Sequence, residues 1–96
     1  MRQVIGSFKM PKENRNLYLR FVLNLLRNKY HVNLSALAKA SDFYPMNLSD
    51  FSRDARDFGI RNLDKLEWFL QDLYGGILED EIPQDELDFN KFIKSL

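Results

Sequence analysis

The sequence contains no cysteine, and its 96 residues include only one histidine, one tryptophan, three prolines and four glycines. Without cysteine the chain can form neither a disulfide nor a thiolate metal site, which fits a reducing compartment. His31 has no second histidine to complete a ligand set, so we expect a loop residue there and no metal site. No apolar run reaches membrane-spanning length, and residues 1–10 are too short and too polar for a signal-peptide core. We therefore expect a cytoplasmic protein that makes no contact with a membrane.

Signatures of catalysis and of cofactor binding are missing as well. No nucleophile is paired with a base in a known pattern, and no glycine-rich loop of the phosphate-binding type is present. The acidic residues between Glu79 and Asp88 lack the glycine and the spacing of an EF-hand loop, which favours a solvated connector over a calcium site. We expect a protein that is not an enzyme and binds no cofactor.

The chain does hold enough apolar surface for one hydrophobic core. Hydrophobic residues make up 45% of it, and its eight Phe and four Tyr bury large areas per side chain. A chain of this length cannot supply two cores. The composition therefore predicts a single folded unit.

Charge is distributed unevenly along the chain, although the formal net charge is zero. Residues 1–41 carry eight Lys or Arg and one acidic residue, whereas residues 42–96 carry six and thirteen. A basic first half offers contacts to phosphates, but a neutral whole weakens non-specific attraction to nucleic acid. The charge pattern alone leaves the kind of partner open.

Apolar residues recur at helical spacing in five stretches of the chain. The pattern predicts helices over residues 11–29, 34–40, 45–54, 62–74 and 84–96. Asn33 and Asn62 should cap the second and fourth helices, and Gly75–Gly76 should end the fourth. Residues 2–9 alternate weakly and fit a short strand, an arm or a disordered leader.

The predicted fold class is therefore all-α, a compact bundle of four to five helices. We divide it into an N-terminal arm over residues 1–10, a helix-turn-helix domain over 11–75, and an acidic connector with a C-terminal helix over 76–96.

Residues 33–54 have the dimensions of a helix-turn-helix, two short helices joined by a turn of about four residues. From residue 27 to residue 51, and then at Leu63, Leu66 and Leu73, the spacing resembles the Cro and lambda-repressor (XRE-type) family. The register holds without a gap from residue 27 to residue 51, and the resemblance covers about two thirds of the chain. The residues that carry it are Arg27, Asn33, Leu37–Ala38, Asp42 and Leu48–Ser49. The resemblance implies a repressor-like regulator of transcription, encoded by a phage or other mobile element. Such a protein binds double-stranded DNA as a dimer, with the third helix in the major groove.

Two positions depart from the family pattern. Leu34 stands where the family has a glutamine that donates to a phosphate, so one phosphate contact is missing. Asp42 stands at the position of the turn glycine, and its short side chain lets it adopt the left-handed conformation at some cost. The turn is therefore expected to form.

The start of the third helix offers the candidate base contacts. Asn47 can pair bidentately with adenine, and Met46 can contact a thymine methyl group. Asp50 can accept only from a cytosine amino group, and Tyr44 lies beside these residues at the beginning of the helix. A solvated helix face explains the same residues equally well.

Four cations are the candidate phosphate contacts. They are Lys39 on the second helix, Arg53 at the end of the third, and Arg56 and Arg61 in the segment that follows. Local ion pairing on a solvated surface is the alternative, because acidic residues lie close to Arg53 and Arg56 in sequence.

Trp68 is the most informative aromatic residue. At roughly 100° per residue, it lies opposite the predicted core face of its helix. That face consists of Leu63, Leu66, Phe69, Leu70 and Leu73. One interpretation is that the C-terminal segment covers Trp68, through Phe89, Phe92 or Leu96. The other is an interface with a partner, such as a homodimer contact, with Trp68, Phe89 and Phe92 as the possible interface residues.

Two functions therefore remain open. The first is a sequence-specific DNA-binding transcriptional regulator. The second is a protein-binding module of the same fold, such as an antirepressor or inhibitor, that engages a protein partner through its acidic face. Leu34 and the acidic residues Asp50, Asp54 and Asp57 favour the second function.

Overall fold

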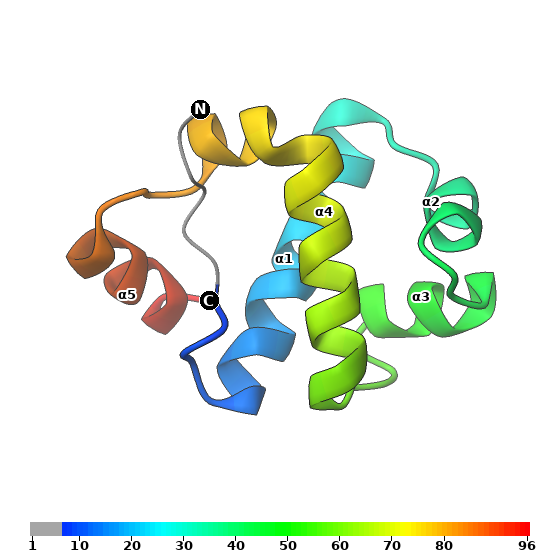
Figure 1. Cartoon of the computed structure of the whole chain (residues 1–96), viewed down its shortest axis with the longest axis horizontal. Coiled ribbons are helices and arrows are strands. Elements are labelled where there is room, and N and C mark those ends of the chain that lie inside the picture. The colour runs from blue at the N-terminus through cyan, green and yellow to red at the C-terminus, as the bar shows by residue number, and fades with distance from the viewer. Residues whose placement is uncertain (1–6) are drawn as a thin grey trace.

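The computed structural model describes residues 7–96. This part of the chain forms five helices, α1 (Lys12–Tyr30), α2 (Leu34–Ala40), α3 (Pro45–Ser52), α4 (Ile60–Glu81) and α5 (Glu86–Lys94) (Figure 1). The all-α prediction is confirmed. The Cα radius of gyration is 12.5 Å, which matches the roughly 12.5 Å expected for a compact chain of this length.

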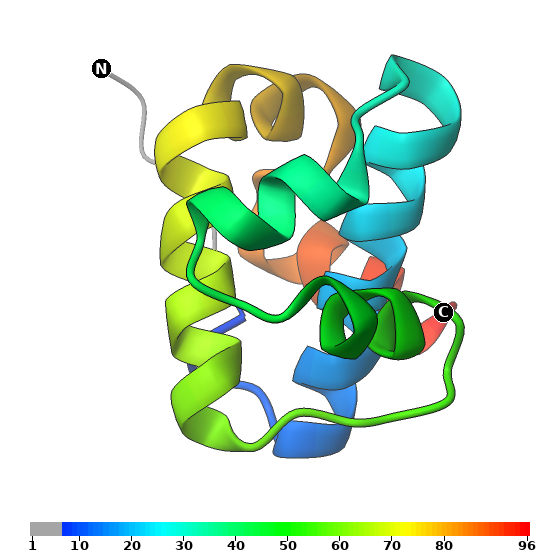
Figure 2. The same ribbon diagram turned by 90° about the vertical axis from the view of Figure 1, so that its right-hand side faces the viewer.

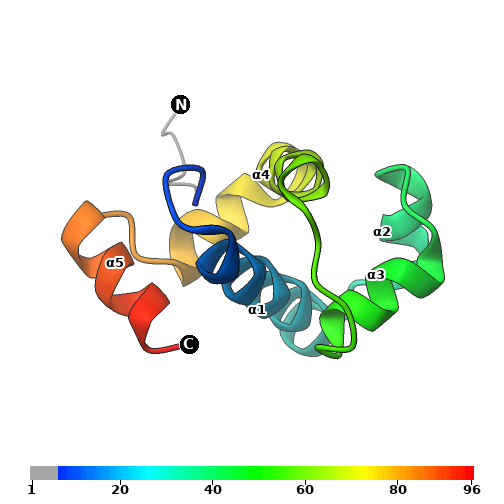
Figure 3. The same ribbon diagram turned by 90° about the horizontal axis from the view of Figure 1, so that it is seen from below.

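The helices are arranged around a central pair. α1 and α4 lie side by side in the middle of the molecule, and α2 and α3 lie together on one side of them (Figures 1 and 3). α5 lies on the opposite side, where it packs against α1. The α2–α3 unit and α5 therefore occupy opposite sides of the bundle.

All five helices contribute to one hydrophobic core. α1 has the broadest buried face, because helices pack against it from three directions. The buried side chains of this core include Tyr18, Leu19, Val22, Leu23, Leu26, Leu37, Ala38, Leu48, Phe51, Leu63, Leu66, Leu70, Leu78, Phe89 and Ile93. The predicted inward positions on the third helix and most of those on the fourth are confirmed.

α2 begins where the sequence predicts. The side-chain oxygen of Asn33 accepts a hydrogen bond from the Ala36 amide at 3.1 Å, which satisfies one of the free donors of the first turn. α3 starts at Pro45 as expected and ends at Ser52, two residues earlier than predicted. The predicted pair of short adjoining helices over residues 33–54 is confirmed.

Three helices end without glycine. His31 after α1, Asp42 after α2 and Asp54 after α3 have left-handed backbone conformations, with φ of 57°, 63° and 63°. Aspartate tolerates this region because its short side chain can bond locally. The left-handed conformation expected of Asp42 is confirmed, and the same conformation at Asp54 ends α3 early.

The prediction that Gly75–Gly76 ends the fourth helix is only partly correct, because the backbone does leave helical geometry at Tyr74 but a second helical segment follows the kink. α4 continues to Glu81, and neither glycine has a positive φ. Leu78 within this extension and Ile82 directly after it are buried in the core. This packing outweighs the low helix propensity of glycine, which costs about 1 kcal/mol per residue.

The beginning and the course of α4 also differ from the prediction. The helix starts at Ile60 after Gly59, so Asn62 is not its cap. At Tyr74 the backbone leaves helical geometry, with φ −118° and ψ 18°, and the helix kinks. Leu73 lies directly before the kink and is 56% exposed, although it was expected in the core.

The C-terminal ends of α1 and α4 are joined by a cluster of polar side chains. The Lys29 ammonium and the Tyr30 hydroxyl both donate to the Glu81 carboxylate, the hydroxyl at 2.6 Å. These hydrogen bonds, that of Lys29 above all, hold the pKa of the Glu81 carboxyl below its ordinary value. The added turns of α4 are thus fixed to α1.

α5 starts at Glu86 rather than near residue 84. The Asp85 side chain determines this start, because it accepts from the amides of Leu87 at 3.1 Å and Asp88 at 3.3 Å. Since residues 76–81 belong to α4, the predicted connector shrinks to residues 82–85. The predicted boundary at residue 75 lies inside a helix.

The N-terminal segment packs against α1 and α4 from residue 7 onward. Residues 2–6 of the predicted arm or strand lie outside the described residues. Ser7 is buried, and both its amide and its hydroxyl donate to the Glu67 carboxylate, the hydroxyl at 2.7 Å. Arg15 donates to the same carboxylate at 3.3 Å and pairs with Asp64 at 2.8 Å. Residues 7–10 are therefore part of the packed structure rather than a free arm.

Candidate nucleic-acid interface

The turn between α2 and α3 is tightly hydrogen-bonded. Asp42 takes the left-handed position, and the Phe43 amide donates back to the Ala38 carbonyl at 2.8 Å. Lys65 of α4 reaches this turn, donates to the Asp42 carbonyl at 2.7 Å and lies 4.1 Å from the centre of the Phe43 ring. The turn is thus fixed to the central helix pair as well as to α2.

The first turn of α3 presents its side chains to solvent. Leu48 and Phe51 point into the core, whereas Tyr44 is 79% exposed and Met46 is 73% exposed. Asn47 is partly exposed beside them. Figure 2 shows α3 at the surface in front of α1, with α2 packed beside it. The residues predicted to contact bases therefore lie on an accessible helix face.

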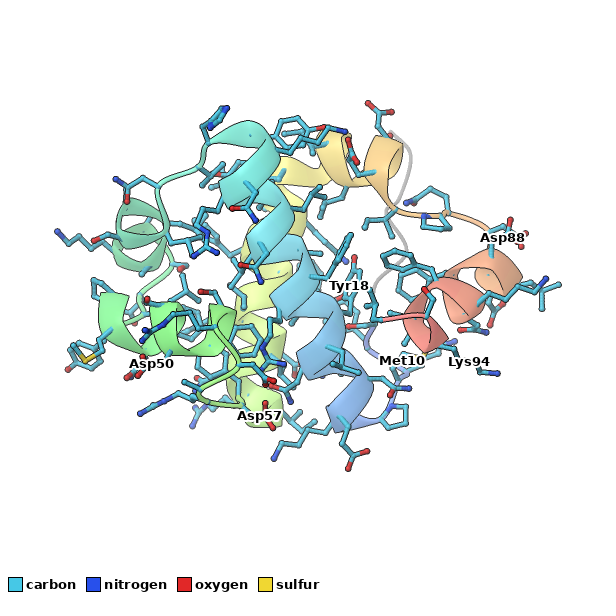
Figure 4. All side chains as sticks on the ribbon, turned by 180° about the vertical axis from the view of Figure 1, so that it is seen from behind. Met10, Tyr18, Asp50, Asp57, Asp88 and Lys94 are labelled. Atoms are coloured by element: carbon cyan, nitrogen blue, oxygen red, sulfur yellow. The ribbon has the colours of Figure 1, made fainter. Side chains whose placement is uncertain are left out.

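The acidic residues of this region are paired with arginines. Asp50 pairs with Arg53 one turn later on the same side of the molecule. Asp54 and Asp57 both pair with Arg20 of α1, at 3.3 Å and 2.8 Å. Figure 4 shows Asp50 on α3 and Asp57 on the loop that follows it. Much of the negative charge near α3 is thus balanced within the chain.

Three of the predicted phosphate contacts keep their charge free of such pairing. Lys39, Arg56 and Arg61 are exposed, and no carboxylate of residues 7–96 forms an ion pair with them. They come from α2, from the α3–α4 loop and from the first turn of α4, on the three segments that border α3. Arg53 differs, because its guanidinium is already bound to Asp50.

A polar stripe on α1, formed by Asn16, Arg20 and Asn24, supports α3 and the following loop. The Asn16 amide group binds both backbone groups of Phe58, donating to its carbonyl at 3.2 Å and accepting from its amide at 2.8 Å. The Asn24 amide donates to the Ser52 carbonyl at 3.0 Å. Arg20, between them, holds the end of α3 and the loop.

The sequence analysis missed this polar stripe. Its signal is a spacing of four residues, which places Asn16, Arg20 and Asn24 on one helix face next to the apolar core face. The pattern alone is also typical of a solvated helix surface, so only the contacts reveal its role.

Trp68 is 66% exposed, and its aromatic neighbour is Phe8 of the N-terminal segment, with ring centres 5.9 Å apart. The interpretation that the C-terminal segment covers it is wrong. Trp68 and Phe8 form an exposed aromatic pair on the outer face of α4.

The C-terminal aromatics pack on α1 instead. Phe89 lies edge-on to Tyr18 at 5.3 Å between ring centres, and Phe92 lies edge-on to Phe21 at 5.1 Å. Phe89 is only 1% exposed, so the prediction that it belongs to an interface is wrong. These contacts place both rings on the apolar face of α1 rather than on Trp68, and burial of their apolar surface there stabilises the fold.

In residues 7–96, no group of three or more His, Asp or Glu side chains could hold a metal ion. The described helices are also too short or too polar to cross a membrane. Comparison with known proteins finds no protein-family model, no curated protein and no solved structure that matches the chain.

Proposed function

We propose that the protein is a sequence-specific DNA-binding regulator of transcription that places the first turn of α3 in the major groove. The observation that carries the proposal is the exposed first turn of α3 within a rigid α2–turn–α3 unit. The Asn47 amide is the base reader, because it pairs bidentately with adenine. Met46 contacts a thymine methyl group beside it.

Phosphate contacts are assigned to Lys39, Arg56 and Arg61. These cations border α3 and have no ion-pair partner among residues 7–96. The start of α4 adds to them, since its first turn has neither a side-chain cap nor an acidic residue and free helix amides attract phosphate. Repulsion from Asp54 and Asp57 is reduced, because both carboxylates pair with the single positive charge of Arg20, which leaves the three groups one negative charge in sum. As a homodimer, the protein reads two half-sites about one helical turn apart.

A selection of bound sequences from a random double-stranded DNA library, with the purified chain at low and physiological salt, tests this function. We expect one enriched motif and an affinity that falls steeply with salt. Asn47→Ala should change the enriched motif, whereas Arg56→Ala should weaken all sequences alike and lower the salt slope by about 1.

Lys94→Ala serves as the control, because Lys94 lies on α5, away from α3 (Figure 4). It removes one positive charge from the opposite side of the bundle and should leave both the motif and the slope unchanged. The absence of any enriched motif at low salt would exclude the proposed function. Equal effects of Asn47→Ala and Arg56→Ala would exclude the division of roles.

A protein-binding module is the second candidate function. It is favoured by the exposed apolar groups of Tyr44 and Met46 and by Leu34, which offers no donor to a phosphate. Trp68 on α4 provides a further exposed aromatic for a partner or a second copy. Under this function, the DNA selection returns no motif, and the unchanged chain captures a specific protein partner. The double variant Tyr44→Ala/Met46→Ala should no longer capture that protein.

A further inference from the structure

Arg20 makes more contacts to the α3 region than any of the residues predicted to bind DNA. Its Nε donates to the Phe51 carbonyl at 2.6 Å, and one terminal nitrogen donates to the Arg56 carbonyl at 3.1 Å. The guanidinium also pairs with Asp54 and Asp57 and lies 4.8 Å from the centre of the Phe51 ring. One side chain of α1 therefore holds the end of α3 and the whole loop that follows it.

Residues 53–57 of the loop have little other support, because all five are exposed, and Asp54 adopts the left-handed conformation there. Beyond the hydrogen bonds that close the end of α3, these residues are held by Arg20. The loop is anchored again at Phe58, whose backbone binds Asn16 and whose buried ring stacks on Phe43 and Phe51. The position of Arg56 therefore depends on Arg20, since its carbonyl is bound directly.

Arg20 cannot itself contact DNA in this arrangement. Only 11% of its side chain is exposed, and its donors are directed at four acceptors of the same chain. A guanidinium carries five donors in a planar fork, whereas an ammonium is a point charge with a different reach. Lysine in its place keeps the charge but cannot reproduce this set of contacts.

From these contacts we infer that Arg20 is the positioning residue of the DNA-reading surface. It fixes the C-terminal end of α3 and the α3–α4 loop, so that Asn47 and Arg56 meet bases and phosphates in one fixed geometry. The role in DNA reading rests on the proposed function. The ordering of the loop is a property of the free protein and can be measured without DNA.

Arg20→Lys tests the inference, with Arg27→Lys as the matched control. Arg27 lies on the same helix, is exposed, and donates only to the side chains of Asn24 and Asn28. Amide hydrogen exchange of the free protein is measured first, at the amides of Asp54 and Ala55. In Arg20→Lys we expect exchange at least about tenfold faster at these amides and unchanged at Phe89 in α5.

DNA binding is then measured at a temperature where all variants are fully folded. Arg20→Lys should bind the selected motif about tenfold more weakly and with a salt slope lower by about 1, because the phosphate contact of Arg56 is lost although the net charge is the same. Arg27→Lys should match the unchanged chain in both measurements. A variant that is merely less stable would show faster exchange at Phe89 as well, with an unchanged slope.

The outcomes separate the inference from the function on which it rests. Unchanged exchange at Asp54 and Ala55 in Arg20→Lys would overturn the positioning role, whatever the DNA result. Faster exchange there, with unchanged DNA affinity in Arg20→Lys, would overturn its link to DNA reading. If the unchanged chain binds no DNA, the proposed function and that link both fail, while the exchange data still decide the ordering of the loop.

Discussion

Asp42 holds a left-handed backbone conformation, φ 63°, in the turn between α2 and α3. Its carbonyl accepts from Lys65, but no hydrogen bond or ion pair of its own side chain is found in residues 7–96. Glycine adopts this conformation at lower cost, whereas alanine occupies the left-handed region less readily than aspartate.

We therefore expect Asp42→Gly to raise the free energy of unfolding by about 0.5–1 kcal/mol and Asp42→Ala to lower it by about 1 kcal/mol. Urea unfolding measures both variants. Equal stabilities of the two would show that the left-handed conformation is not maintained in solution.

Tyr18 carries a buried hydroxyl that has no hydrogen-bond partner among residues 7–96. Burial, and secondarily the charge of Glu67, raises the pKa of the Tyr18 hydroxyl above its ordinary value. A raised pKa means that the folded state favours the neutral phenol. Its contribution to stability is complete below about pH 10, the ordinary tyrosine pKa, and is lost as the pH rises further.

We expect the free energy of unfolding to fall above about pH 10, and Tyr18→Phe to reduce this fall. At pH 7 the variant should be about 1 kcal/mol more stable, because an unpaired buried hydroxyl is removed. Urea unfolding between pH 7 and pH 11 measures both effects, with the exposed Tyr44→Phe as the control. A loss of stability in Tyr18→Phe at pH 7 would reveal a hidden partner of the hydroxyl.

Local chemistry explains which residues could be predicted from the sequence. Asn33 accepts from a backbone amide three residues away, and the Asp42 amide donates to a carbonyl three residues away. The local sequence was therefore sufficient to predict the roles of both residues. The partners of Asn16, Arg20 and Asn24 lie 28–42 residues away along the chain. Such contacts depend on how α1 and α3 pack, which no local pattern contains.

Among the helices, α4 shows how packing can override a local signal. The pair Gly75–Gly76 is typical of a helix end, and the backbone does kink at Tyr74, yet a second helical segment continues to Glu81, where Leu78 and the following Ile82 are buried in the core. Trp68 illustrates the same limit. Helical periodicity placed it away from the core face, but it could not identify Phe8 as its neighbour.

Gly76 therefore weakens a helix that other residues stabilise. A Cβ atom there would meet nothing within 4 Å, so Gly76→Ala should raise the free energy of unfolding by about 0.5–1 kcal/mol. Gly59→Ala is the matched control, since it is the same substitution in equally open space but at the N-cap of α4, where alanine is disfavoured. Thermal unfolding should shift upward for the first variant and not for the second. A downward shift for Gly76→Ala would mean that the helix does not pass through this residue.

At the scale of the whole molecule, α5 completes the core from the side opposite α3. Phe89 is buried against Tyr18, whereas Leu87 on the same helix is exposed. Phe89→Ala should lower the free energy of unfolding by about 3–5 kcal/mol, and Leu87→Ala should change it by less than about 0.5 kcal/mol. Urea unfolding compares the two. Similar small effects would show that α5 is a detachable tail rather than part of the bundle.

The aromatic pair of Phe8 and Trp68 gives the molecule a built-in optical reporter. Trp68 is the only indole in the chain, and its exposed ring lies against a segment that Ser7 anchors to Glu67. Intrinsic fluorescence and its quenching by iodide therefore monitor attachment of the N-terminal segment without any added label. Far-ultraviolet circular dichroism monitors the helices independently, so the two signals together distinguish release of that segment from melting of the bundle.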